Sequence, residues 1–137
     1  MDFAYCKLEI FLPENHLPAL QAALREVDAG HIGRYDSCLS YSRVTSCWRP
    51  LAGTAPYLGT PGLLSTEPEL KVEVTCPTGQ VDRTVEAVKR VHPYEEPVIN
   101  VIPLYRNDFA FARSAKVDGL QVNPFYVYQA MYWTKAN

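Results

Sequence analysis

Two segments with helical periodicity lie among four segments with strand character, and this order restricts the fold more than any other feature. Residues 3–12 carry apolar side chains at even positions and charged ones such as Lys7 and Glu9 at odd positions, which predicts a strand with one buried face. Residues 38–51, 70–76 and 98–105 are also strand-like, because β-branched, aromatic or alternating apolar residues dominate them. Apolar stripes at helical spacing predict two helices, which contain Leu17, Leu20, Leu24 and Val27 in the first and Val81, Val85 and Val88 in the second.

In chain order the predicted elements form the split βαβ pattern. We therefore expect an α+β, ferredoxin-like βαββαβ fold, in which a four-stranded antiparallel sheet carries both helices on one face. The domain is predicted to span residues 1–105. Residues 106–137 are predicted to form a C-terminal extension that packs on the domain or on a neighbouring subunit. The predicted sheet contains the large aromatic side chains of Tyr41 and Trp48. We therefore expect another subunit or the extension to cover the open face of the sheet.

Turn and cap residues indicate where the helices begin and end. Asn15 is predicted to cap the first helix, with Pro18 in its first turn, and Thr78 is predicted to cap the second. Gly30 is the expected C′ residue of the first helix, since glycine readily adopts a positive φ. The glycines and prolines within residues 52–68 predict a long, turn-rich excursion between two strands.

Composition excludes several classes of function. The 137 residues carry a net charge of −2 and no run of Lys and Arg, so nothing favours binding to nucleic acid. No apolar stretch is long enough to span a bilayer, and acidic Asp2 stands where a signal peptide would be basic. We therefore expect a cytoplasmic location. The 4 cysteines form no CxxC pair and are interpreted as small core hydrophobes rather than as disulfide or zinc ligands.

Three stretches resemble one known family: residues 30–38, which begin Gly-His-Ile-Gly-Arg-Tyr-Asp; residues 48–62, which begin Trp-Arg-Pro-Leu; and residues 92–104, which begin His-Pro-Tyr-Glu-Glu-Pro. Over residues 3–105 the chain resembles the CutA-like, PII-like domain inserted in NGG-interacting-factor-like (Nif-three-like) proteins, in a stand-alone single-domain form. The resemblance implies a ferredoxin-like fold and assembly into trimers. It does not imply the metal chemistry of the larger proteins, whose ligands lie in a flanking domain. The chain departs from the family pattern at Arg34, Val44, Ser46 and Trp48.

Candidate site residues gather in the same stretches. Gly30 and Gly33 can form a backbone nest for an anion around His31, or simply end a helix and turn. Arg49 can bind a carboxylate or phosphate, or pair with Glu73. The candidate ligand-binding residues are Gly30, His31, Gly33, Tyr35, Arg49, His92, Tyr94, Glu95 and Glu96, and no catalytic residue is assigned.

A divalent metal ion is the one cofactor that the sequence suggests. His31 and His92 each follow a predicted helix, and if the two helices run parallel, both histidines lie at the same end of the sheet. The candidate metal ligands are then His31, His92 and Glu95. The alternative interpretation is architectural, with His92 at a helix C-terminus, where a cation is favoured, and with the flanking prolines shaping the turn.

The sequence thus favours a non-catalytic PII/CutA-like module that self-associates, as a trimer or a multiple of it, and binds a small ligand or partner in the clefts between subunits. A divalent-metal-binding protein is the second hypothesis. A hydrolase is the third, because no Ser-His-Asp or Cys-His arrangement and no phosphate-binding loop stands out.

Overall fold

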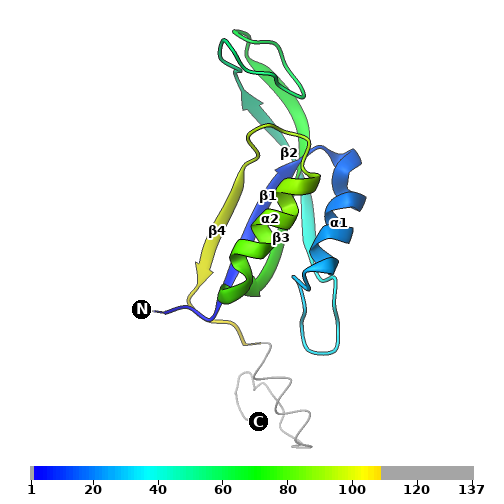
Figure 1. Cartoon of the computed structure of the whole chain (residues 1–137), viewed down its shortest axis with the longest axis vertical. Helices are drawn as coiled ribbons and strands as arrows, with labels where there is room; N and C mark the ends of the chain where they lie inside the picture. Colours follow the sequence, from blue (N-terminus) through cyan, green and yellow to red (C-terminus); the bar gives the residue numbers. More distant parts are fainter. Residues whose placement is uncertain (1, 109–137) are drawn as a thin grey trace, which may run out of the picture. The chain divides into compact units, whose positions relative to one another are not determined.

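The computed structural model describes residues 2–108. A four-stranded antiparallel sheet contains β1 (Tyr5–Leu12), β2 (Ser40–Trp48), β3 (Ser65–Pro77) and β4 (Ile99–Leu104) in the order β2-β3-β1-β4. Helices α1 (Leu17–Glu26) and α2 (Val81–Val91) cover one face of the sheet (Figure 1). The predicted ferredoxin-like α+β fold is confirmed. Most of the predicted C-terminal extension, from residue 109 onward, lies outside the described residues.

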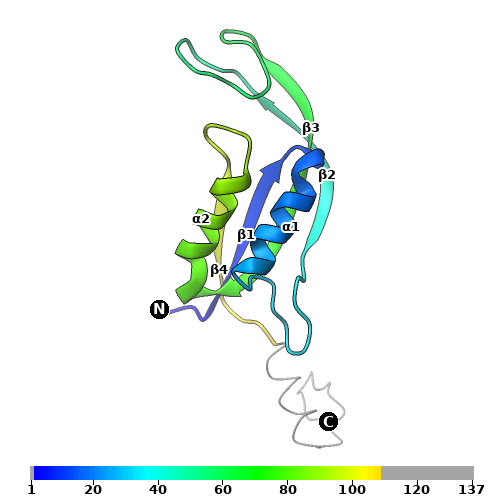
Figure 2. The same ribbon diagram turned by 45° about the vertical axis from the view of Figure 1, so that its right-hand side comes forward.

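The core lies between the sheet and the two helices, which stay on the same side of the sheet when the molecule is turned (Figure 2). Alternate residues of β1 and β3 face the helices, and directly opposite partners share a face. The buried side chains of the core come from both layers and include Leu8, Ile10, Leu12, Leu20, Leu24, Leu70, Val72, Val74 and Val88. Cys6 and Cys76 are buried opposite each other in the core, as predicted. The same prediction is wrong for Cys47, which is exposed, and Cys38 is only half-buried.

The two helices run antiparallel, which corrects the expectation that they run parallel. Helix α1 follows the C-terminal end of β1, whereas α2 follows β3, which is antiparallel to β1. At the end of α1, the Gly30 N–H donates to the Thr75 carbonyl at 2.9 Å, and Thr75 lies opposite Lys7. At the end of α2, His92 contacts the Phe11 carbonyl. Four residues of β1, or roughly 13 Å, separate the two anchoring points.

The predicted helix caps are corrected as well. Helix α1 has His16 at its N-cap position and no side-chain cap, because the Asn15 side-chain oxygen is bonded to the His16 ring. Thr78 begins a short 3₁₀ turn ahead of α2, and its hydroxyl donates to the Phe3 carbonyl at 2.6 Å. Pro18 does lie in the first turn of α1, as expected.

Helix α1 ends in a Schellman motif that does not use Gly30 as its C′ residue. Asp28 takes the left-handed position with φ 59°, and its N–H donates to the Arg25 carbonyl while the Ala29 N–H donates to the Leu24 carbonyl. Gly30 has a different role. With φ +80°, its Cα lies so close to the Cys38 carbonyl that a Cβ would collide with the oxygen, and the closed loop that follows depends on this approach.

Strands β2 and β3 extend beyond the rest of the sheet and form an arm, defined here as residues 44–69. The arm consists of the paired segments 44–48 and 65–69 and the connecting loop 49–64, whereas β1 pairs with β3 only from Leu70 onward. The predicted excursion over 52–68 is therefore too long at its C-terminal end. Pro68 lies within β3 opposite Thr45, and it is tolerated there because β3 has no β1 neighbour at that position.

Residues 2–31 and 36–104 form one compact unit, to which residues 32–35 and 105–108 do not belong. The sheet, both helices and the arm belong to this unit. Within residues 2–108, no helix has the length and apolar character needed to span a bilayer.

Candidate ligand-binding cavity

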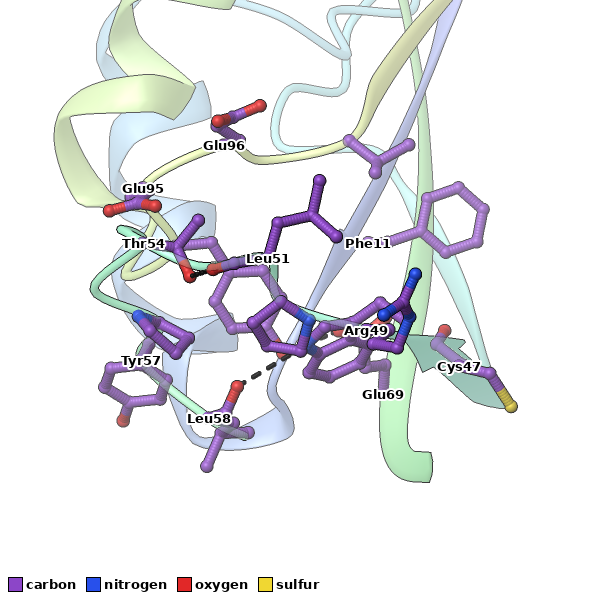
Figure 3. A pocket seen from close by; sticks show the side chains of 16 residues that line it. Phe11, Cys47, Arg49, Leu51, Thr54, Tyr57, Leu58, Glu69, Glu95 and Glu96 are labelled. Atoms are coloured by element: carbon purple, nitrogen blue, oxygen red, sulfur yellow. Dashed lines mark hydrogen bonds between the residues drawn. The ribbon is translucent and has the colours of Figure 1, made fainter. Parts of the chain in front are cut away.

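A cavity of about 580 Å³ lies between the arm, the end of β1 and the turn that follows α2. Aromatic and apolar side chains make up most of its walls, including the rings of Phe11, Trp48, Tyr57 and Tyr94. The charged side chains that line it are Arg49, Glu69, Glu95 and Glu96. Figure 3 shows Arg49 on the same side of the cavity as Cys47, with Glu95 and Thr54 on the opposite side. The cavity is thus an aromatic space with few charges, the usual character of a small-molecule site.

His92 fixes the turn to the sheet. Its Nε2 lies 2.6 Å from the Phe11 carbonyl oxygen, and because a carbonyl only accepts, Nε2 must carry the hydrogen. Its Nδ1 then accepts a hydrogen bond from the Tyr94 N–H at 3.2 Å. Burial lowers the pKa of His92, opposed by the Phe11 hydrogen bond and by Glu69. Both ring nitrogens are therefore occupied by backbone groups, which makes His92 an architectural residue.

Tyr94 joins the turn to the arm. Its hydroxyl donates to the Glu69 carboxylate at 2.6 Å, and Glu69 is only 4% exposed. Burial, together with the hydrogen bond to Glu69 and the charge of Glu69, raises the pKa of Tyr94, so the phenol stays protonated and donates. The Tyr94 ring lies 5.7 Å from the Trp48 ring and 5.9 Å from the Tyr57 ring, between centroids. Tyr94 is consequently the centre of the cavity wall.

Hydrogen bonds donated by backbone N–H groups hold the arm loop over the cavity. The Ala55 N–H donates to the Glu95 carboxylate at 3.2 Å, so the loop is attached to the turn after α2. The Gly62 N–H donates to the Pro50 carbonyl at 2.7 Å, which closes the base of the loop. Gly59 has φ +105° and packs so closely that a Cβ would lie 2.5 Å from the Ser65 hydroxyl. The loop is thus shaped by contacts within the arm and to the turn.

The structure brings together only part of the predicted site. Arg49, Tyr94, Glu95 and Glu96 line the cavity, and His92 packs behind the Tyr94 ring with 4.9 Å between centroids. The predicted anion nest is not part of this cavity. Gly30 and His31 lie at the C-terminal end of α1, and Gly33 and Tyr35 belong to the segment 32–35 that groups separately.

The predicted metal ligands do not form one cluster. His31 bonds the Asp28 carboxylate at 2.9 Å near the end of α1, whereas His92 lies at the other end of the sheet. The cause is the antiparallel course of the two helices. Among residues 2–108, no group of three or more His, Cys, Asp or Glu side chains is placed to hold a metal ion.

Arg49 does not pair with Glu73, contrary to one interpretation of the sequence. The register places Ser40 opposite Glu73, nine positions before Arg49 along the chain. Glu73 instead binds Lys7 at 3.1 Å and Lys71 at 3.7 Å. Within residues 2–108, Arg49 takes part in no ion pair.

The cavity residues that sequence reasoning missed include Phe11, Tyr57 and Glu69. Phe11 comes from a strand with no motif, so no local signal marks it, whereas Tyr57 lies in the stretch 48–62 that carries the family resemblance but was not chosen as a ligand-binding residue. Glu69 follows Pro68 and precedes the alternating residues of β3. Because proline is unusual within a strand, the sequence did not predict that β3 begins before Pro68. The burial of Glu69 depends on the contact between the arm and Tyr94, which only the fold creates.

A ring of four charges occupies the middle of the open sheet face. Lys7 and Lys71 each bind both Glu9 and Glu73, with N···O distances of 3.9 and 3.1 Å for Lys7 and 3.6 and 3.7 Å for Lys71. The expected aromatic load is absent from this centre. Tyr41 lies opposite core residue Val72 and so faces the helix side, and Trp48 lies in the arm.

Known proteins resemble this chain in sequence and in fold. The chain is 40% identical over 98 residues to a GTP cyclohydrolase 1 type 2 homolog of Halalkalibacterium halodurans, covering 72% of this chain and 26% of the relative. The solved structure of a Bacillus cereus protein related to NIF3 superposes with a TM-score of 0.66 at 30% identity, over 76% of this chain and 26% of that one. No family model matches the chain.

A smaller solved protein shares the fold over nearly its whole length. The periplasmic divalent cation tolerance protein CutA of Archaeoglobus fulgidus superposes with a TM-score of 0.59 at 18% identity, covering 78% of this chain and 90% of the CutA chain. This likeness concerns the fold alone. The chain spans about a quarter of the length of the relatives that it matches in sequence.

Proposed function

From the premise that this chain is homologous to one segment of NIF3-related proteins and has the CutA fold, we propose that it is a non-catalytic, self-associating module. Copies of the chain associate through the open sheet face, and each holds a small ligand in the cavity beneath the arm. The word cyclohydrolase in the names of the relatives refers to whole proteins, of which this chain matches about a quarter. The proposal does not assume a cyclohydrolase activity for this chain.

The observation that carries the proposal is the state of the open sheet face. Its four central charges already neutralise one another within the Lys7–Glu9–Lys71–Glu73 ring, so covering the ring leaves none of these four without a partner. Apolar side chains border the ring. Since directly opposite residues share a face, Ile102 lies beside Lys7 and Leu104 beside Tyr5. A second copy can therefore cover this face by packing on its apolar border while the paired charges keep their partners.

Light scattering at micromolar concentration tests the association. We expect a trimer or a multiple of it. Replacing Ile102, which is 36% exposed on the open face, by Glu should dissociate the assembly, because a new carboxylate without a partner would be buried at the interface.

Leu63→Glu is the matched control. Leu63 is 62% exposed in the arm loop, away from the charge ring of the open face, so the same change of charge there should leave the assembly intact. A monomeric unmodified protein, with the circular dichroism of a folded α+β domain, would refute association through the sheet.

A further inference from the structure

The cavity beneath the arm has a wall of three adjoining aromatic rings. The centroid of the Tyr94 ring lies 5.7 Å from that of Trp48 and 5.9 Å from that of Tyr57, so Tyr94 contacts both of the other rings. The Trp48 N–H is directed to the Leu58 carbonyl at 3.4 Å, which holds this ring in place. The faces of such rings attract cations and apolar groups alike.

The charges that line the cavity are mainly negative. Three carboxylates, those of Glu69, Glu95 and Glu96, face one guanidinium, that of Arg49. Arg49 is exposed at the rim, where water screens its charge. Glu69 is almost completely buried and therefore determines the electrostatic character of the interior more strongly.

The Glu69 carboxylate lacks a cationic partner within residues 2–108. Its bond is to the neutral Tyr94 hydroxyl, which stays protonated. A buried carboxylate held by a neutral donor is costly compared with one that faces a positive charge. A cation that entered the cavity would therefore gain from Glu69 and from the three rings at once.

We infer that the cavity binds an organic cation with an apolar body, in which the positive group lies against Trp48, Tyr57 and Tyr94 and is neutralised by Glu69. The inference rests on the proposed function, since it names the ligand class of the same cavity. Arg49 provides the competing chemistry, a carboxylate ligand at the rim, and the experiment separates the two.

Isothermal titration of the full chain with three probes of similar size tests the inference: benzyltrimethylammonium, which is permanently cationic, neutral benzyl alcohol and anionic benzoate. We expect the cation to bind at least about tenfold more tightly than either other probe. Glu69→Gln should abolish most of this preference, because the amide can still accept the Tyr94 hydrogen bond but carries no charge. Glu86→Gln, an equal change of charge on the exposed surface of α2, should leave it unchanged.

Tighter binding of benzoate, lost in Arg49→Gln, would overturn the cation assignment while leaving the cavity as a ligand site. Equal affinity of the unmodified protein and Glu69→Gln for the cation would overturn the role of Glu69 and thus the inference. Binding of none of the probes would overturn both the inference and the ligand site. Self-association is measured separately by light scattering, so its failure is distinct from each of these results.

Discussion

At the scale of single residues, His92 shows how burial reverses the effect of a helix end. The C-terminus of a helix favours a cation, and the sequence suggested that a charged imidazole would be favoured there. In the fold, His92 is 8% exposed and donates to the Phe11 carbonyl. Burial is the main reason that its pKa is lowered. The neutral imidazole is therefore the form that the native structure selects.

This selection predicts a pH dependence of stability. The unfolded imidazole protonates as pH falls below its ordinary pKa of about 6.5, whereas the folded one resists, so the stability from neutral His92 is complete above that pH. It is lost as pH falls towards and through the lowered pKa of the folded state. His92→Gln, which keeps a donor but does not titrate, should show a weaker loss between pH 7.5 and 5.5 in urea unfolding.

His92→Ala provides the second measurement at this position. It leaves the Phe11 carbonyl and the Tyr94 N–H without their partner, so it should cost about 1–3 kcal/mol at pH 7.5. His16→Gln removes a nearby imidazole whose charge is the least of the causes that lower the pKa of His92, so it should weaken the pH dependence less than His92→Gln does. If His92→Gln keeps the pH dependence of the unmodified protein in full, another group is responsible for it.

At the scale of the elements, the connections between helices and strands decide the geometry of the site. The turn after α2 carries His92, which binds β1, Tyr94, which binds the arm at Glu69, and Glu95, which binds the arm loop. The loop after α1 makes an equally close contact at its own end, where Gly30 meets Cys38 and Thr75. The C-terminal end of α1 is thus fixed to the sheet by a backbone hydrogen bond, and that of α2 by the side chain of His92.

Gly30→Ala tests the second of these connections, with Gly53→Ala as a matched control. Both glycines have positive φ, +80° and +90°, but a Cβ would collide with the Cys38 carbonyl only at Gly30 and would meet nothing within 4 Å at Gly53. Gly53→Ala should cost about 1 kcal/mol from backbone strain alone. Gly30→Ala should cost clearly more in urea unfolding, and equal costs would contradict the close approach.

At the scale of the whole molecule, the charge ring of the open face has two different expected effects. On an exposed surface such pairs contribute little to stability, about 0–1 kcal/mol each. The same pairs become important when a second copy covers them, because the loss of one carboxylate would then bury two lysines with only one glutamate to neutralise them. Stability of one chain and association of several chains should therefore respond differently to the loss of one ring member.

Glu73→Gln tests this difference. The pKa of Glu73 is lowered chiefly by its hydrogen bond to Lys7, so the carboxylate is ionised in the ring at neutral pH. The variant should change the free energy of unfolding by less than about 1 kcal/mol but weaken association at least about tenfold in light scattering over a dilution series. Glu86→Gln should change neither quantity, and an assembly unaffected by Glu73→Gln would place the interface elsewhere.

The order of elements and the core could be predicted because both follow from local periodicity. Alternation over residues 3–12 and 70–76, and the apolar stripes of the two helices, indicate which face of each element is buried. The cavity was predicted only in part, at Arg49 and in the turn His92–Pro97, where unusual local composition marks the chain. Caps were predicted less well, since several residue types can end a helix and the neighbouring contacts select among them.

Tertiary structure alone decided which residues meet. The sequence determined that two helices follow two strands, but the antiparallel pairing of β1 with β3 decided that the helices run in opposite directions, and this separates His31 from His92. It also made Glu69 a buried residue of the cavity, because the Tyr94 hydroxyl reaches it from a turn 25 residues away along the chain. Periodicity reports the environment along one element, whereas a site depends on distances between elements, and these are fixed only when the core packs.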